Sequence, residues 1–243
     1  MDKEKTGIEI VIIGDVYSGK STLIEQLIYK CGGVDKRTIE KCEKLSATTA
    51  DCVVLMVSAC IGEFENSISE NGQTRQQILF AYMFGAKQMI IAVNKMDANT
   101  VSYSENRFNQ IQIELSTYLK QIGYPLENVA FVPISAWNGD NLVTISNKMV
   151  WVTGWIVERQ EGNVICKTFL EALDTIAQRQ QFMNKPLRLP LQDVYKVRGI
   201  GTVAMGRIET GVLKRNMTVS FSPLNLTATV RSIEMCYETL EGN

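Results

Sequence analysis

Histidine is absent from the 243 residues of the chain. No imidazole is therefore available as a general base or as a metal ligand. Long apolar runs are absent as well, because the longest, Cys52–Cys60 and Met89–Val93, have the length of strands and are far shorter than a membrane span. Met1–Thr6 is too charged to begin a secretory signal. We therefore expect a soluble, cytoplasmic protein with no membrane partner.

Paired cysteines and an excess of one charge are also missing. The six cysteines form no Cys-x-x-Cys spacing, which argues against metal sites and disulfides and favours reduced, packed thiols. The formal net charge of −1 provides no overall field for nucleic acid, although a local basic patch remains possible. Hydrophobic residues make up 45% of the chain, and its length is sufficient for the hydrophobic cores of one large domain and a smaller one.

A phosphate-binding pattern lies near the N-terminus. Gly14 is followed after four residues by Gly19, Lys20 and Ser21, between the apolar run Ile8–Ile13 and a stretch with helical spacing. The glycines permit a tight loop of inward-facing N–H groups, Lys20 can reach phosphates, and the Ser21 hydroxyl suits Mg²⁺. The alternative is a glycine-rich turn that only joins a strand to a helix. The candidate phosphate-binding residues are Gly14, Asp15, Ser18, Gly19, Lys20, Ser21 and Thr22, with Ser21 as the metal ligand.

A base-binding pattern follows a later apolar run. Met89–Val93 leads directly into Asn94–Asp97, the run Asn-Lys-Met-Asp, at the end of a predicted strand, where open parallel sheets bind ligands. Asp97 can accept hydrogen bonds from the ring N–H and the exocyclic amine of guanine, and adenine offers neither. Lys95 can lie along the base, and Asn94 can tie this loop to the phosphate loop. Taken alone, the tetrapeptide is also a common turn at the end of a strand.

A third candidate segment, Ser135, Ala136 and Trp137, follows the apolar run Val129–Ile134. Its backbone N–H groups can meet the carbonyl oxygen of guanine, although a tripeptide is too short to be specific. Trp137 is more often a core or lid residue than a stacking platform. We include all three residues in the predicted nucleotide site.

Apolar periodicity predicts an α/β fold. Runs of strand length alternate with helical spacing, as in a parallel sheet. One helix is expected over Arg75–Phe84, with Ile78, Leu79 and Tyr82 on one face. From Pro186 the pattern changes to short strands separated by Gly and Asn turns, which indicates a small antiparallel barrel or sandwich, although few residues remain for closing one. The predicted parallel strands are Ile8–Ile13, Cys52–Ala59, Met89–Val93 and Val129–Ile134.

Together these motifs resemble the elongation factor 1-alpha family, GTPases that deliver aminoacyl-tRNA to the ribosome. The resemblance implies a phosphate-loop GTPase-like parallel sheet with flanking helices in residues 1–180, and a truncated antiparallel β-barrel domain in residues 186–243. It also implies GTP or GDP and Mg²⁺ as ligands, and aminoacyl-tRNA, the ribosome and a nucleotide-exchange factor as partners. The similar stretches are Met1–Leu45, which includes Ile28–Glu40, and then Ala50 through Val93–Asp97, Phe131–Asp140 and Pro186–Val212 to about Glu238.

The chain departs from the pattern of that family. Between Leu45 and Ala50 it lacks the two switch segments and two strands, so residues near 45–50 mark an internal deletion and the sheet should be reduced to about four strands. The family usually has histidine in place of Asp15 and aspartate in place of Tyr17, and it continues beyond the last residue with more of the second domain and a third domain. Because the missing strands lie at one edge, Ile8–Ile13 should become an exposed edge, which predicts marginal solubility or self-association.

These departures predict a weakened nucleotide site. We expect weak GDP or GTP binding, weakened Mg²⁺ binding, and slow or absent hydrolysis, because the family positions water with a switch histidine that this chain lacks. Without the switches no two-state element remains for GTP to bias, so tRNA delivery should be largely lost. No catalytic residue is assigned. The alternative is a nonenzymatic truncated copy that acts, if at all, through protein contacts.

Overall fold

The computed structural model describes residues 10–31, 52–83, 85–86, 88–159, 162–176, 183–206, 208–235 and 238–239. The chain divides into two compact units, Met1–Gln178 and Arg179–Asn243. The expected deletion near 45–50, the first two residues of the predicted strand Ile8–Ile13 and the last residue of the predicted helix Arg75–Phe84 lie outside the described residues. Among the helices in the described ranges, none combines the length and apolar character that a membrane crossing needs.

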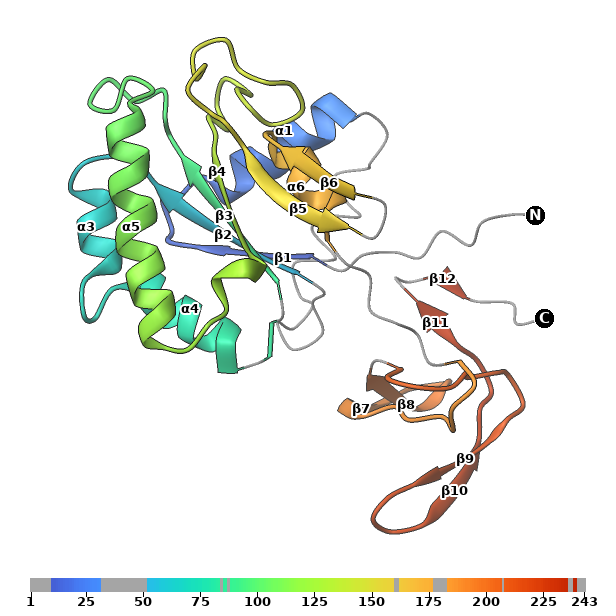
Figure 1. Ribbon diagram of the computed structural model, residues 1–243. Coiled ribbons are helices and arrows are strands. Elements are labelled where there is room, and N and C mark those ends of the chain that lie inside the picture. The colour runs from blue at the N-terminus through green and yellow to red at the C-terminus, as the bar shows by residue number, and fades with distance from the viewer. Residues whose placement is uncertain are drawn as a thin grey trace. The chain divides into compact units, whose positions relative to one another are not determined.

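The first unit is built on a four-stranded parallel sheet with the strand order β1-β2-β3-β4 (Figure 1). In its register Val54 lies between Ile12 and Ile90, and Ile90 pairs in turn with Ala130. This confirms the predicted parallel sheet of four strands, and it places β1 at one edge. The strands are β1 (Ile10–Gly14), β2 (Cys52–Ser58), β3 (Met89–Asn94) and β4 (Val129–Pro133).

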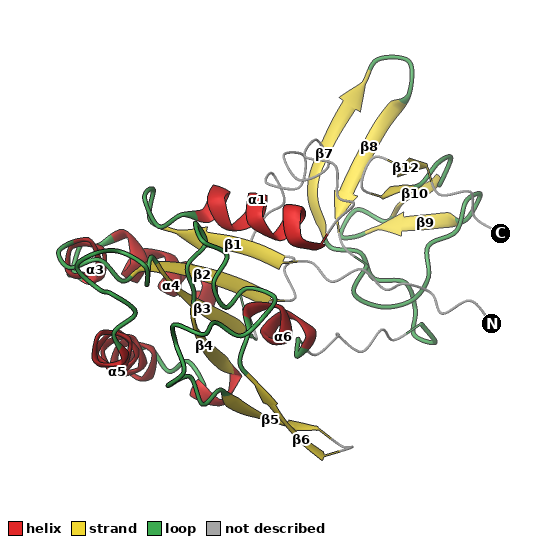
Figure 2. Ribbon diagram, turned by 90° about the horizontal axis from the view of Figure 1, so that it is seen from above, coloured by secondary structure: helices red, strands yellow, loops and turns green. Residues whose placement is uncertain are grey.

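Helices cover both faces of this sheet (Figures 1 and 2). On one face lie α3 (Glu63–Ile68), α4 (Gln73–Met83) and α5 (Glu105–Gln121), and on the other lie α1 (Lys20–Cys31) and α6 (Phe169–Asp174). A 3₁₀ turn, η1 (Leu126–Asn128), precedes β4. An antiparallel pair, β5 (Trp155–Arg159) and β6 (Gly162–Cys166), precedes α6.

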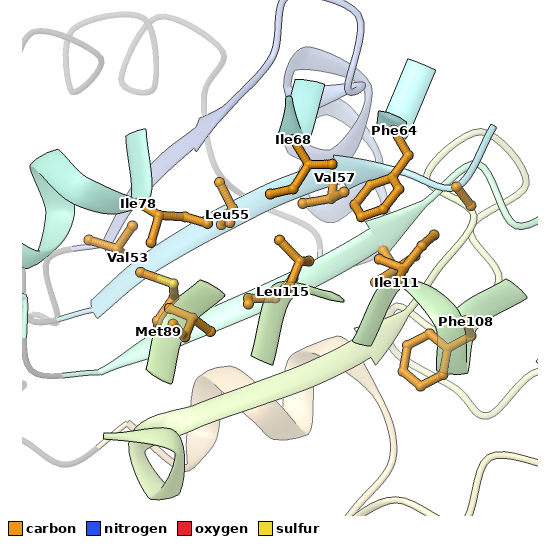
Figure 3. Close-up of a cluster of buried hydrophobic side chains, with 14 of the residues drawn as sticks. Val53, Leu55, Val57, Phe64, Ile68, Ile78, Met89, Phe108, Ile111 and Leu115 are labelled. Atoms are coloured by element: carbon orange, nitrogen blue, oxygen red, sulfur yellow. The ribbon is translucent and has the colours of Figure 1, made fainter. Parts of the chain in front are cut away.

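Strand β2 is buried along its whole length because alternate residues face different helices. Val53, Leu55 and Val57 pack into one hydrophobic cluster with residues of α3, α4 and α5 (Figure 3). Cys52, Val54 and Met56 belong to a second cluster on the other face, with residues of α1 and α6. The parallel strands thus form the middle layer of the first unit, as their near-continuous apolar sequence predicts.

Helix α4 buries a different face from the one that its sequence suggests. Ile78, Leu79 and Tyr82 share one side of the helix, but only Ile78 is buried, together with Thr74 and Ala81. Leu79 and Tyr82 are 41% and 42% exposed. The reason is the position of α4, which packs against β1 and β2 at the edge of the sheet. Within the described chain, no strand beyond β1 covers the outward-facing side of this helix.

The described residues of the second unit form three antiparallel strand pairs, each a separate two-stranded sheet. Within this unit none of the described residues is fully buried. The small antiparallel domain predicted after Pro186 is therefore present as strand pairs. The pairs are β7 (Leu191–Val197) with β8 (Gly201–Gly206), β9 (Thr218–Phe221) with β10 (Leu226–Thr229), and β11 (Glu234–Met235) with β12 (Glu238–Thr239).

Candidate functional site

The predicted site residues follow three parallel strands at the points where the strands end. Strand β1 ends at Gly14, β3 at Asn94 and β4 at Pro133. Because neighbouring strands are parallel, their carboxyl ends share one edge of the sheet. The phosphate loop (residues 14–19), the Asp97 loop (residues 94–104) and the Trp137 loop (residues 134–141) therefore meet at that edge.

Two glycines allow the phosphate loop to lie close to its neighbours. Gly19 has a φ of 92°, which is a left-handed conformation, and a Cβ there would collide with the side-chain amide of Asn94. A Cβ on Gly14 would lie 2.5 Å from the carbonyl oxygen of Met56 and 2.6 Å from Ser18 Oγ. The buried Ser18 donates from its N–H and its hydroxyl to the Asp15 carbonyl at 3.1 and 2.8 Å. The loop is thus compact, and no larger residue fits at either glycine.

A cation and a carboxylate share this loop. Lys20 Nζ donates to the carbonyl oxygens of Gly14 and Asp15 at 2.8 and 2.6 Å. Burial lowers the pKa of the Lys20 ammonium, and the nearby Asp15 carboxylate partly offsets that effect. The Asp15 carboxylate itself accepts the N–H of Val16 at 2.6 Å. The loop therefore offers an ammonium group to an anion, while Asp15 adds an opposing charge and occupies one backbone donor.

Ser21 and Thr22 belong to the first turn of α1. Ser21 is exposed and Thr22 is half-buried, so the Ser21 hydroxyl is accessible as a ligand. In the part of the chain that the structure describes, no three His, Cys, Asp or Glu residues cluster as a metal site. Mg²⁺ is commonly held by few protein ligands together with phosphate oxygens and water. A single accessible hydroxyl beside a phosphate loop fits that mode of binding.

Asn94 joins the three loops of the edge. Its Nδ2 donates to the Ser18 carbonyl in the phosphate loop at 2.8 Å, and its Oδ1 accepts the N–H of Ala136 at 2.8 Å. The side chain is 3% exposed. The predicted link between the Asp97 loop and the phosphate loop is therefore present, and the same amide also fixes the Trp137 loop.

Lys95 and Asp97 differ in how far their charges are already paired. Lys95, at a φ of 63°, donates from Nζ to Glu63 Oε2 at 2.7 Å, and Glu63 accepts a second hydrogen bond from Ser58 at 2.6 Å. Burial raises the pKa of Glu63, but these hydrogen bonds outweigh it and the pKa is lowered. Asp97 is half-buried, and its carboxylate has neither a hydrogen-bond nor an ion-pair partner within the described ranges. It is free to accept hydrogen bonds from a ligand.

In the Trp137 loop, two of the three predicted donors are already used. The N–H of the buried Ser135 donates to the Asp140 carbonyl at 3.1 Å, and that of Ala136 donates to Asn94. The N–H of Trp137 has no acceptor among the described residues. The Trp137 side chain is 76% exposed, so it is not a core residue, and its carbonyl accepts from Gln26 of α1 at 3.3 Å.

The structure adds polar residues that the sequence motifs did not single out. Glu63 comes from α3, which was not predicted, and pairs with Lys95. Tyr103 and Asp140 hydrogen-bond across the Asp97 and Trp137 loops at 2.7 Å. The only sequence signal for these contacts is the Asn-Gly-Asp-Asn turn around Asp140, which is typical of a shaped loop.

One groove in the described residues lies away from the candidate site. It has a volume of about 600 Å³ and is lined by Arg75 of α4 and by polar side chains of α5 such as Asn106, Gln110 and Glu114. None of the predicted site residues lines it. The candidate site is therefore defined by converging loops and not by this groove.

Comparison with known proteins identifies a family. The family described as elongation factor Tu GTP binding domain matches residues 43–179, which include the Asp97 and Trp137 loops and begin after the phosphate loop. The solved structure of Sup35 complexed with GDP is 32% identical in sequence, with a TM-score of 0.59 over 96% of this chain. The chain spans 61% of the length of that Sup35 chain.

Two more distant structures share the fold. The GTPase-like domain of S. cerevisiae Ski7, bound to GTP, has a TM-score of 0.62 at 17% identity, over 97% of this chain and 66% of the Ski7 chain. Translation elongation factor SelB from Methanococcus maripaludis has a TM-score of 0.59 at 19% identity, over 98% of this chain and 49% of that one.

Proposed function

The chain belongs to the elongation factor Tu GTP-binding domain family, and we propose that it binds GDP and GTP at the edge where the phosphate, Asp97 and Trp137 loops meet. One observation carries the proposal. Asn94 is hydrogen-bonded to both the phosphate loop and the Trp137 loop, so the groups suited to phosphate and to guanine are held in one arrangement. Preorganised polar groups of this kind lower the cost of ordering a ligand.

Most of the predicted residues have a role in this proposal, whereas the N–H groups of Ser135 and Ala136 are already used within the protein. Lys20 and the backbone of Gly14, Asp15 and Gly19 would face the phosphates, with Thr22 beside them. Ser18 would shape the loop, because its N–H and hydroxyl donate to the Asp15 carbonyl. Asp97 accepts from the ring N–H and amine of guanine, the Trp137 N–H donates to its carbonyl oxygen, and the Lys95 stem lies along the base while Glu63 holds its ammonium. Ser21 would hold Mg²⁺, which when bound neutralises phosphate charge.

Within the family, the motifs favour an elongation factor 1-alpha-like protein of translation, working in the cytoplasm, with reduced activity. Histidine is absent from the sequence, so the family's water-positioning side chain is not available and hydrolysis should be slow or absent. Binding of aminoacyl-tRNA, the ribosome and an exchange factor should be weakened or lost, because the stretch between Leu45 and Ala50 is too short for the switches.

A second candidate function, action through protein contacts alone, is favoured by exposed apolar side chains on α4. Phe80 and Met83 are 53% and 70% exposed, and the helix lies beside the edge strand β1. Apolar surface next to the open edge of a sheet is a common place for a partner to bind. A folded protein that binds no guanine nucleotide would favour this candidate.

The test is a titration with a fluorescent GDP analogue, with ADP as competitor. We expect saturable binding that ADP does not displace. Asp97→Asn should weaken binding about 10- to 100-fold, because charge-assisted hydrogen bonds to the base are lost. Asp193→Asn, the same substitution in β7 of the second unit, is the matched control and should have no effect. Equal binding by all three proteins, or displacement by ADP, would contradict a guanine site at Asp97.

Asp15→Asn tests the phosphate side of the site, and it should change the affinity for GDP in the opposite direction to Asp97→Asn. The Asp15 carboxylate lies in the loop that should hold phosphates and already accepts a backbone N–H. Removing its charge should strengthen GDP binding by about threefold to tenfold, since like charges oppose each other at short range. Weaker binding by Asp15→Asn would instead mean that the carboxylate supports the loop.

A further inference from the structure

The Asp97 and Trp137 loops are joined by a polar cluster outside the three motifs. The Tyr103 hydroxyl donates to Asp140 Oδ2 at 2.7 Å. Lys148 Nζ donates to the same carboxylate oxygen at 3.1 Å and to the Tyr103 hydroxyl at 3.0 Å. Asn138 Nδ2 also donates to that hydroxyl at 3.3 Å. We call Tyr103, Asp140 and Lys148 the Tyr103 clasp.

The two main members of the clasp are each connected to one base-binding loop. Tyr103 donates its N–H to the carbonyl of Met96 at 2.7 Å, immediately before Asp97. Asp140 accepts the N–H of Ser135 at 3.1 Å, in an isolated antiparallel bridge that closes the Trp137 loop. The Tyr103–Asp140 hydrogen bond therefore links the turn that holds Asp97 to the turn that holds the Trp137 N–H.

The backbone at Tyr103 is held in an unfavourable conformation. Ser102 and Tyr103 have backbone φ values of 47° and 57°, which residues other than glycine rarely adopt. Such residues persist where surrounding contacts fix them, and they are frequent at binding sites. Here the Tyr103 carbonyl accepts from Trp151 Nε1 at 3.0 Å, and Trp151 packs on Phe108. The conformation places the Tyr103 hydroxyl on Asp140.

The charge on Asp140 supports the same geometry. Burial raises the pKa of Asp140, but the hydrogen bonds from Tyr103 and Lys148 outweigh it and the pKa is lowered. The carboxylate is therefore ionised at neutral pH and accepts from Tyr103, Lys148 and Ser146, the last to Oδ1 at 3.2 Å. Charge-assisted hydrogen bonds of this kind are stronger than neutral ones.

We infer that the Tyr103 clasp fixes the spacing between Asp97 and the Trp137 N–H, so that guanine contacts both at once. The inference rests on the proposed guanine site and deepens it. Tyr103 and Asp140 are positioning residues, because they act through the loops and not by touching the base. Groups that are already held at the correct spacing lose little conformational entropy when a ligand binds. A loosened clasp should therefore weaken the binding only of ligands that contact both loops.

The experiment uses two nucleotides that differ in their need for the Trp137 loop. GDP has a 6-oxygen that can accept the Trp137 N–H. The diphosphate of 2-aminopurine riboside lacks both this oxygen and the ring N–H, so it offers Asp97 only the exocyclic amine. Both are measured by competition against fluorescent GDP with the full chain. Tyr103→Phe should weaken GDP about 5- to 10-fold and leave the 2-aminopurine nucleotide within about twofold.

Tyr118→Phe is the matched control, because the half-buried Tyr118 hydroxyl donates to the Arg75 carbonyl at 3.3 Å, away from the edge. It should change neither affinity. Lys148→Gln, at a 53% exposed side chain, provides a second variant should Tyr103→Phe fold poorly, and it should weaken GDP about twofold to threefold with the same selectivity.

The outcomes separate the two proposals. If the folded wild-type chain binds no GDP, the guanine site is wrong and the clasp inference falls with it. If the wild type binds GDP and Tyr103→Phe leaves its affinity unchanged, the guanine site stands and the clasp is refuted. Equal weakening of both nucleotides by Tyr103→Phe would also refute it, because a general structural role does not depend on the 6-oxygen.

Discussion

Strands β2 and β7 each contain seven residues, but every residue of β2 is buried and six of the seven in β7 are exposed. Strand β2 lies between two parallel neighbours with helices on both faces, so its hydrogen bonds and its side chains are satisfied together. Strand β7 pairs only with β8 and has no second layer over it within the described ranges. Pairing of strands alone supplies hydrogen bonds but little hydrophobic stabilisation.

The difference matters for function because the candidate nucleotide site stands on the first unit. Asn94 ends the fully buried strand β3, Asp97 follows it, and the Trp137 loop follows β4. Sites on rigid, well-packed elements hold their groups more accurately than sites on exposed hairpins. The comparison between the two units therefore predicts where the chain resists opening and where it does not.

Amide hydrogen exchange should show the largest difference. Amides of β3, such as those of Ile90 and Ala92, open only with the core of the first unit, whereas amides of β7 and β8 open with a hairpin that buries no residue. We expect protection about 1000-fold greater in β3, which corresponds to about 4 kcal/mol. Comparable protection in the two units, measured by mass spectrometry, would show that the second unit has a core of its own.

A matched pair of valine substitutions should show the next largest effect. Val54 is 0% exposed in β2, so Val54→Ala removes buried methyl groups and leaves a cavity, which should lower the free energy of unfolding by about 2–3 kcal/mol. Val203→Ala in the partly exposed β8 should leave the free energy of unfolding of the first unit unchanged. Urea unfolding followed by tryptophan fluorescence reports on the first unit, because all three tryptophans belong to it. They are Trp137, Trp151 and Trp155. A shift caused by Val203→Ala would mean that the units unfold together.

The edge strand β1 offers a contrast with the covered strand β3. Ile10 is 36% exposed at the edge of the sheet, and edge strands that lack charge tend to pair with other chains. Ile10→Lys should weaken self-association about fivefold, as measured by sedimentation equilibrium. Ile113→Lys, on the exposed side of α5, is the control and should have less effect. An equal effect of both substitutions would point to general surface hydrophobicity in place of edge pairing.

A smaller effect should appear on acidification. The hydrogen bond from Arg107 lowers the pKa of Glu65 in the folded first unit. A lowered folded-state pKa gives stability that is present above the unfolded value of about 4.3 and is lost as the pH falls through the folded value. Glu65→Gln should therefore reduce stability at pH 7, and the difference from the wild type should shrink as the pH falls below about 4.3. A difference that is unchanged at pH 3 would exclude ionisation as its cause.

The amino-acid sequence by itself determined the local parts of this protein. The four parallel strands were predicted to within a residue or two wherever the structure describes them, because buried strands need unbroken apolar runs. The tie from Asn94 to the phosphate loop was also predicted, since parallel strands deliver their carboxyl ends to one edge. The family relation is shown for residues 43–179, which include the Asp97 and Trp137 loops but not the phosphate loop.

Only the tertiary structure decided which of these groups remain available. Asn94 accepts the N–H of Ala136 and Glu63 forms an ion pair with Lys95, whereas the Asp97 carboxylate has no partner among the described residues. All of them belong to short polar segments that look alike in the sequence. The Tyr103 clasp joins residues 37 positions apart through a left-handed turn without glycine. Such contacts depend on how packed elements bring distant loops together, and no local periodicity encodes that distance.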